Sequence, residues 1–479
     1  MSLILPQCRF IPINSVLAVL LLLVALSPIA FCGTRQSLPE KQVIREDDTR
    51  VALSNSHAFS QPVASLSMSE RLDFSVGNSF FRNPWVMAPS STTARDGLGP
   101  LFNTNGCQNC HIKDGRGHLP EASDENAVSL LLRLSVPALE GQEQLLREQG
   151  VVAEPNYGDQ LQDFAIPGVA AEGQIKVDYR EIPFQFHDGE TVSLREPVIS
   201  IEQPGYGELH KNVMISARIA PPMIGLGLLA AVPDQALLVM EDSEDSDRDG
   251  ISGRVNRVWD KQKSATVVGR FGWKSGQPTL RQQNAAAFLG DLGITSSLFP
   301  EQNCTASQIA CRQSVAGGTP ELSENILDKV TFYTHHLAVP ARRGETDVQV
   351  MAGEQLFLDA GCVACHKPSL QTADSPFPSL AFRLIAPYTD LLLHDMGEGL
   401  ADHRPEFAAS GSEWRTPPLW GIGLTREVSG RESYLHDGRA RTLMEAILWH
   451  GGEAANARGR VEKMSRQQRD ALLMFLRSL

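Results

Sequence analysis

The chain contains the segment Cys107-Gln108-Asn109-Cys110-His111, and the same pattern returns in Cys362-Val363-Ala364-Cys365-His366. Cys-x-x-Cys-His is the attachment site of c-type haem, in which two thiols form thioethers with the porphyrin and the histidine binds the iron. A thioredoxin-like motif does not require the histidine twice, and a zinc site would need further ligands at fixed spacing. The two motifs therefore predict two covalently attached haems, with His111 and His366 as iron ligands.

The first 32 residues are typical of a secretory signal peptide. Arg9 is the only charge before an apolar run over residues 16–26, and small residues follow it. The run is too short to favour a permanent membrane span. Cys32 follows a sequence similar to a lipobox, which leaves a lipid-anchored form open. We expect an exported, periplasmic protein without an integral membrane span once the signal (1–32) is removed.

Charge and the remaining cysteines add two expectations. The net charge of −13, with no basic stripe to offset it, excludes a nucleic-acid surface and suits docking to a small redox protein that donates or accepts electrons. Cys304 and Cys311 lie seven residues apart in a polar segment. In an oxidising compartment they are predicted to form a disulfide.

The organisation of the chain is predicted from periodicity and from a repeat. Residues 150–205 alternate and are rich in Gly and Pro, which favours short strands, with a hairpin turn at His187-Asp188-Gly189. Most other segments have helical spacing or are loops. An Arg-Pro-Pro loop occurs at 218–228 and again at 415–424. The expected fold is mainly α: an N-terminal arm (33–75), a first cytochrome-c-like haem domain (76–340) with a small strand-containing insert, and a second (341–479).

An acidic loop over residues 245–253 resembles a calcium-binding loop. Asp245, Asp247 and Asp249 stand at positions 1, 3 and 5, and the carbonyl of Ile251 at position 7. Position 12 is Asn256 rather than the usual glutamate. Calcium is the prediction for this loop, and an acidic surface turn is the alternative.

Several segments resemble the bacterial di-haem cytochrome c peroxidase superfamily, and in particular its di-haem oxidoreductase branch. The likeness runs from about residue 80 to the C-terminus. It is strongest in His394-Asp395-Met396-Gly397, in Arg415-Thr416-Pro417-Pro418-Leu419-Trp420-Gly421, and in His436-Asp437-Gly438-Arg439.

The resemblance implies ligands for the second haem. In the superfamily the distal ligand lies fourteen positions past the histidine of the His-Asp-Gly turn, and counting from His436 reaches His450. Ligation by His366 and His450 fills both axial positions, which suits electron transfer rather than substrate binding. Met396 is the alternative ligand.

The resemblance also implies catalytic residues near the first haem. Trp273 would carry electrons between the haems, and Gln283, ten residues on, would orient peroxide or water. Asp291 would move the peroxide proton. It is shorter than the family's Glu and lies two residues closer to the Gln, which puts peroxide cleavage in doubt. His118 is a further candidate as a resting-state ligand of the first iron, with a surface histidine as the alternative.

Together these residues predict an exported di-haem oxidoreductase of the peroxidase type. Electrons would pass from the second haem to the first, where a small oxidant such as peroxide is reduced. Two alternatives stay open: a non-catalytic di-haem electron-transfer cytochrome, and an oxidoreductase acting on thiols or sulfur compounds.

Overall fold

The structure is a computed structural model that describes residues 49–121 and 127–479. The predicted signal peptide, Cys32 and the first part of the predicted arm lie outside the described residues. Within the described part of the chain, no helix is long and apolar enough to cross a membrane.

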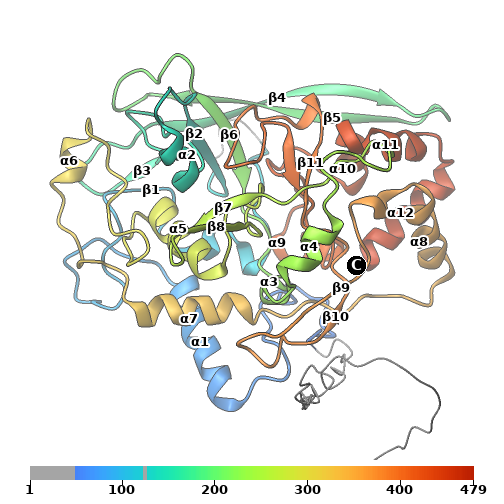
Figure 1. The fold of residues 1–479 in the computed structure, drawn as a ribbon, viewed down its shortest axis with the longest axis horizontal. Helices are drawn as coiled ribbons and strands as arrows, with labels where there is room; N and C mark the ends of the chain where they lie inside the picture. The colour runs from blue at the N-terminus through green and yellow to red at the C-terminus, as the bar shows by residue number, and fades with distance from the viewer. Residues whose placement is uncertain (1–48, 122–126) are drawn as a thin grey trace, which may run out of the picture. The chain divides into compact units, whose positions relative to one another are not determined.

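The helices are short and spread along the whole described chain (Figure 1). Their bounds are α1 (Met68–Arg82), α2 (Glu143–Gln149), α3 (Leu226–Ala230), α4 (Asp234–Met240), α5 (Leu280–Leu292), α6 (Ile309–Arg312), α7 (Glu324–His335), α8 (Val348–Asp359), α9 (Thr425–Ser429), α10 (Leu443–Trp449), α11 (Ala455–Glu462) and α12 (Arg466–Ser478). Ser323, Asp347 and Ser465 cap α7, α8 and α12 by accepting backbone N–H groups of the first turn.

The strands pair two by two, always antiparallel. The pairs are β1 (Leu101–Phe102) with β3 (Phe164–Ala165), β2 (Leu130–Ser135) with β6 (Met214–Ile219), β4 (Gln174–Gln185) with β5 (Thr191–Glu202), β7 (Arg257–Asp260) with β8 (Ala265–Val268), β9 (Leu370–Gln371) with β10 (Leu384–Ile385), and β11 (Leu393–Asp395) with β12 (Glu413–Arg415).

The predicted mainly-α fold with two cytochrome-c-like domains is wrong. Of the described residues, 30% are helical and 18% lie in strands, which are distributed over many small sheets. Six of the twelve described strands have only two or three residues, too few for alternation to be detected in the sequence, because a periodic signal needs at least four residues. The run Leu130–Ser135 has four leucines, three of them consecutive, and so short an apolar run cannot be told from a buried helix segment by periodicity alone.

The hairpin predicted within 150–205 is confirmed as β4 and β5. Its register runs from Gln174 opposite Glu202 to Gln185 opposite Thr191, and Gly189 in the turn has a φ of +88°. In Figure 1 the hairpin extends toward α10 and α12, and Phe186 at its tip is buried among the C-terminal helices. Although it lies in the first half of the sequence, the hairpin thus packs against the second.

Two close helix pairs frame the ends of the fold, and each depends on a glycine. A Cβ at Gly77 in α1 would lie 2.1 Å from the Lys329 carbonyl oxygen of α7. A Cβ at Gly353 in α8 would lie 1.9 Å from the Ala471 carbonyl oxygen of α12. Only glycine permits such an approach of two helix backbones.

The predicted disulfide is confirmed. Cys304 and Cys311 are bonded, with their Cα atoms 5.8 Å apart, and Cys311 is buried within α6.

Candidate haem sites

The two Cys-x-x-Cys-His motifs adopt the same local structure. Each begins with one 3-10 turn, Cys107–Asn109 and Cys362–Ala364. In each, the histidine N–H donates to the carbonyl of the first cysteine at 2.9 Å, which closes a helical turn around the motif. The four motif cysteines are free thiols. The fold therefore presents two thiols and one imidazole together at both positions.

Both motif histidines are oriented for ligation. Nδ1 of His111 lies 2.8 Å from the Pro221 carbonyl oxygen, and Nδ1 of His366 lies 2.9 Å from that of Tyr388. A proton on Nδ1 leaves the lone pair of Nε2 for a metal, and such a carbonyl partner is the usual second contact of a ligating histidine. Burial lowers the pKa of each imidazole to about 4, so both are neutral at pH 7 and able to bind iron.

A cavity of about 370 Å³ lies against the second motif. Cys362, Cys365 and His366 line it, and so do both candidate distal ligands, His450 and Met396. His450 Nδ1 lies 2.7 Å from the Ala446 carbonyl oxygen, and burial lowers the pKa of its imidazole. The second motif, a free imidazole Nε2 and an apolar cavity are thus brought together, as a bound haem requires. Whether His450 or Met396 binds the iron stays a prediction.

Two buried arginines also line this cavity, Arg116 and Arg415. Burial lowers the pKa of each to about 10, and both remain cationic at pH 7. Cations at such a site suit the carboxylates of haem propionates. The sequence analysis did not identify Arg116, although it lies only five residues after His111. The loop that follows the first motif thus supplies a side chain to the second site.

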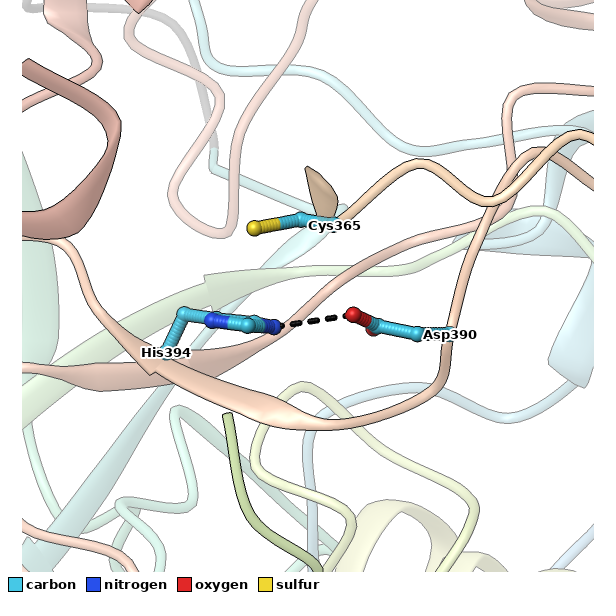
Figure 2. A group of neighbouring side chains, drawn as sticks. All are labelled: Cys365, Asp390 and His394. Atoms are coloured by element: carbon cyan, nitrogen blue, oxygen red, sulfur yellow. Dashed lines mark hydrogen bonds and ion pairs between the residues drawn. The ribbon is translucent and has the colours of Figure 1, made fainter. Parts of the chain in front are cut away.

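His394 forms a buried ionic group beside Cys365 (Figure 2). Its Nε2 lies 3.0 Å from Asp390 Oδ2, and its Nδ1 lies 2.6 Å from Glu453 Oε2. Burial opposes a charge on His394, but hydrogen bonds to Asp390, Cys365 and Glu453 outweigh it and raise the pKa of the imidazole. Ligand atoms of Cys365, Asp390 and His394 lie within 4.8 Å of one another. Such a trio could hold a metal only while Cys365 is a free thiol, because thioether formation consumes that ligand.

Trp273 lies at the second site. Its indole lines the cavity of the second motif, and its Nε1 donates to the Ile219 carbonyl oxygen at 2.8 Å. Pro221, two residues after Ile219, contacts His111 Nδ1 through its carbonyl oxygen. Trp273 is thus linked to the first motif only through the backbone of residues 219–221, and its position between the haems stays a prediction.

The two other predicted catalytic residues lie on α5. The Asp291 carbonyl accepts from the N–H groups of Asn103 and Thr104 at 2.9 and 3.1 Å, just before the first motif. Burial and the Asp291 carboxylate raise the pKa of the Cys107 thiol to about 12 and also raise that of Cys110. Burial also raises the pKa of Asp291 itself, whose Oδ1 accepts from Gln160 Nε2 at 2.9 Å.

Gln283 lies two turns away, about 12 Å along the helix axis. Its Oε1 would be 3.8 Å from a Cβ at Gly272, next to Trp273. The structure thus brings Asp291 to the first motif and Gln283 to the tryptophan. His118 contacts the Leu119 carbonyl oxygen, at 3.1 Å, and its proposed ligation stays a prediction.

The acidic loop gathers its three carboxylates as the sequence suggested. Oxygens of Asp245, Asp247 and Asp249 lie within 4.8 Å of one another, on an exposed turn. They also accept backbone N–H groups of the loop, such as Gly250 N–H at Asp245 Oδ1 and Ile251 N–H at Asp249 Oδ1. An Asx-rich turn explains these contacts without an ion. Calcium at this loop stays a prediction.

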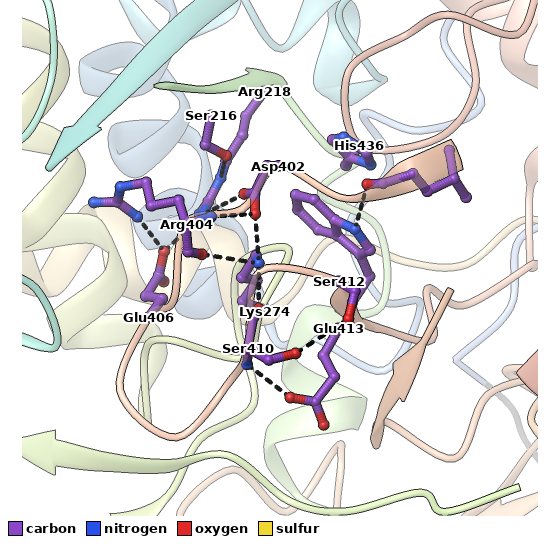
Figure 3. A network of polar contacts seen from close by, with 12 residues as sticks. Ser216, Arg218, Lys274, Asp402, Arg404, Glu406, Ser410, Ser412, Glu413 and His436 are labelled. Atoms are coloured by element: carbon purple, nitrogen blue, oxygen red, sulfur yellow. Dashed lines mark hydrogen bonds and ion pairs between the residues drawn. The ribbon is translucent and has the colours of Figure 1, made fainter. Parts of the chain in front are cut away.

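A buried ion cluster supports the wall of the second site (Figure 3). Lys274 Nζ lies 2.9 Å from Asp402 Oδ1, and Glu406 Oε2 lies 2.8 Å from Arg218 and 3.0 Å from Arg404. The cluster stands behind Trp414, whose indole stacks on His436 with ring centroids 3.6 Å apart. Lys274 Nζ is 4.4 Å from the centroid of the same indole. These contacts fix two aromatic rings that line the cavity.

The sequence of this chain matches that of a known protein family. The profile of the family described as "Di-haem oxidoreductase, putative peroxidase" matches residues 46–479. The chain belongs to the di-haem oxidoreductase family. Among solved structures, Kuenenia stuttgartiensis hydrazine synthase pressurised with 20 bar xenon matches with 14% identity over 88% of this chain and 94% of that chain, at a TM-score of 0.34. That score is too low to establish a shared fold. No curated protein sequence matches.

Membership of the di-haem oxidoreductase family implies two haems and redox chemistry. The residues present fit this cofactor at both motifs: paired thiols, a neutral imidazole with Nε2 free, and at the second motif a cavity with buried cations. The sequence reasoning found the residues that lie inside the motifs. It named His394 and Arg415 as parts of the resembling segments without giving them a role, and it assigned none to Arg116 and Glu453; all four reach the second site through the fold.

Proposed function

We propose that this di-haem oxidoreductase is an exported c-type cytochrome that reduces peroxide at the first haem with electrons delivered by the second. The observation that carries the proposal is the position of Asp291, a buried carboxyl with a raised pKa held beside Cys107 and Cys110. A carboxyl whose pKa is raised accepts a proton more readily than an ordinary aspartate, and peroxide cleavage requires such a group whereas simple electron transfer does not.

The protein's own residues divide the work between the two sites. At the second, His366 and His450 line one cavity and would both bind the haem iron, so that this site would pass electrons and exclude substrate. At the first, Gln160 fixes the Asp291 carboxyl by donating to Oδ1 at 2.9 Å. Trp273, which lines the second cavity and donates to Ile219 two residues before Pro221, would carry the electron between them. Haem, when bound, supplies the redox-active iron at both.

The location and partners follow from the same proposal. Covalent haem attachment, the signal-like leader and the disulfide all suit the periplasm. The net charge of −13 favours a basic redox protein as electron donor.

Asp291→Asn tests the proposal in the purified holoprotein. Peroxide consumption with a chemically reduced protein should fall by about 100-fold or more, because the amide cannot accept a proton. Haem content, measured by the pyridine haemochrome spectrum, should not change. The control is Asp470→Asn, which alters an exposed carboxylate on α12 and should leave turnover intact.

Two results would contradict the proposal. Full turnover in Asp291→Asn removes Asp291 from the mechanism. A wild-type protein that consumes no peroxide and keeps two low-spin haems at every redox level is an electron carrier instead.

A further inference from the structure

A buried phenol and carboxylate lie beside the first motif. Tyr333 on α7 and Asp114 are both 0% exposed, and the Tyr333 hydroxyl donates to Asp114 Oδ1 at 2.5 Å. Asn78 Nδ2 donates to the same phenol oxygen at 2.7 Å, and Ser60 Oγ donates to Asp114 Oδ2 at 2.6 Å. The proton of Tyr333 therefore has a ready acceptor, and the phenol oxygen keeps a hydrogen bond once that proton has left.

Tyr333 is also close to the histidine of the first motif. Asp114 lies three residues after His111, and its N–H donates to the His111 carbonyl at 2.9 Å. The ring of Phe81 packs against both, with its centroid 5.3 Å from that of Tyr333 and 6.0 Å from that of His111. Tyr333 thus contacts the first site through one carboxylate and one aromatic ring.

The charges around the pair favour proton transfer coupled to electron loss. No cation pairs with Asp114 among its described contacts, so the carboxylate that accepts from the Tyr333 hydroxyl at 2.5 Å is not held in a salt bridge. Burial and the neighbouring carboxylate raise the pKa of Tyr333 well above its usual value. The phenol therefore keeps its proton until an electron leaves.

The second motif offers an internal comparison. Tyr388, whose ring packs on Phe357 as does that of His366, donates to Glu354 Oε1 at 3.2 Å. Arg342 holds Glu354 with two hydrogen bonds, at 3.1 and 2.9 Å, and lowers the pKa of the carboxyl. A carboxylate neutralised in this way is a weak base at a longer distance. Only the pair at the first motif is arranged to take up a phenol proton.

We propose that Tyr333 is a redox-active tyrosine that serves the first haem, with Asp114 as its proton acceptor. Tyr333 gives one electron to the oxidised first haem, its O–H bond breaks, and the proton moves to Asp114 Oδ1 to form a neutral carboxylic acid beside a phenoxyl radical. An electron from the second haem reduces the radical, and the proton returns. This role deepens the proposed peroxidase function and rests on it for the source of the oxidant.

The test generates the oxidant by light, so that it does not depend on peroxide. The holoprotein is oxidised by flash-quenched ruthenium tris-bipyridine, frozen, and measured by electron paramagnetic resonance. We expect a tyrosyl radical whose hyperfine structure collapses when the six tyrosines are ring-deuterated. Tyr333→Phe should lose at least nine-tenths of this signal, whereas Tyr388→Phe should keep it. A full signal in Tyr333→Phe, or no tyrosyl signal in the wild type, overturns the inference.

Two further variants separate a redox role from a structural one. Asp114→Asn retains a hydrogen-bonding group but no base, and should reduce the radical yield at least tenfold with haem content unchanged. Asn78→Ala leaves both reacting groups in place and should raise the largest g value of the radical, because its oxygen loses a donor. An unshifted g value overturns the assignment even if Tyr333→Phe fails to fold. A light-driven Tyr333 radical without peroxide turnover leaves the inference standing and refutes only the proposed peroxidase.

Discussion

Imidazole orientation alone does not select the iron ligands of this protein. Nδ1 of His335 and of His336 also lies within 2.8 Å of a carbonyl one turn back on α7. What sets His366 and His450 apart is that both line the same cavity, beside two cysteines. The ligand assignment therefore rests on the combination of a free Nε2 with a space that a porphyrin can enter.

The choice between His450 and Met396 can be tested by exchange of one ligand at a time. His450→Ala should convert the second haem of the ferric holoprotein from low spin to high spin, because alanine offers no sixth ligand. Met396→Leu, which removes the alternative ligand from the same cavity, should leave the low-spin spectrum unchanged. Optical and paramagnetic resonance spectra report both. The reverse pattern would make Met396 the ligand.

The buried carboxyl of Glu172 lowers the free energy of unfolding when it is ionised, so this effect depends on pH. Burial raises its pKa from 4.5 to about 8, although Gln162 N–H and Gln308 Nε2 donate to its two oxygens. The folded state binds this proton more tightly than the unfolded state, so the free energy of unfolding falls as pH rises from 4.5 to 8. Glu172→Gln should raise the melting temperature above pH 8, with a gain that shrinks to zero below pH 4.5. Thermal unfolding between pH 4 and pH 9 measures this, and a gain independent of pH contradicts it.

Among the elements, the loop closed by Cys304 and Cys311 is the simplest to test. The bond closes a short loop that leads into α6, and this lowers the entropy of the unfolded chain. Replacing both cysteines with serine should cost about 2 kcal/mol of stability. Chemical denaturation gives the value. Haem spectra should not change, because the loop lies outside both motifs, and an altered spectrum would show a coupling that the structure does not predict.

The β4–β5 hairpin is anchored at its tip as well as along its length, where Val177 is 1% exposed. Phe186 is 4% exposed, the Arg469 guanidinium lies 4.0 Å from the centroid of its ring, and Asp188 accepts from the same arginine at 2.7 Å. Phe186→Ala should cost about 3 kcal/mol. Val198→Ala, at a side chain on β5 that is 52% exposed, should change stability by less than about 0.5 kcal/mol. Equal effects in denaturant titrations would show that the tip is not an anchor.

These elements show what the sequence could and could not predict. β4 and β5 alternate over twelve residues each, enough for a period of two to be detected. β11 and β12 have three residues each, and their pairing depends on contacts between distant segments. The same holds within the sites. The motif cysteines and histidines are identified by the residues next to them. The hydrogen bond between His394 and Glu453 joins residues 59 apart, and the sequence around either residue does not predict this pairing.

At the scale of the whole molecule, the two halves share one core. The largest buried cluster includes Phe59 and Ile224 from the first half together with Leu392, Trp420 and Val428 from the second. The ion cluster behind Trp414 likewise joins Lys274 to Asp402. The predicted boundary between residues 340 and 341 therefore separates two segments of sequence whose apolar surfaces are buried against each other.

Cutting the chain at that boundary tests how far the halves depend on each other. Residues 344–349 are exposed, so a protease site inserted there can be cleaved in the folded holoprotein. We expect the two fragments to elute together in gel filtration and to separate only in denaturant, since separation would expose the shared core to water. Each fragment would retain one covalently bound haem, which makes its elution visible by absorbance. If the fragments separate in buffer and the C-terminal one keeps a low-spin spectrum, the second half is an independent haem domain and the shared core is not essential to it.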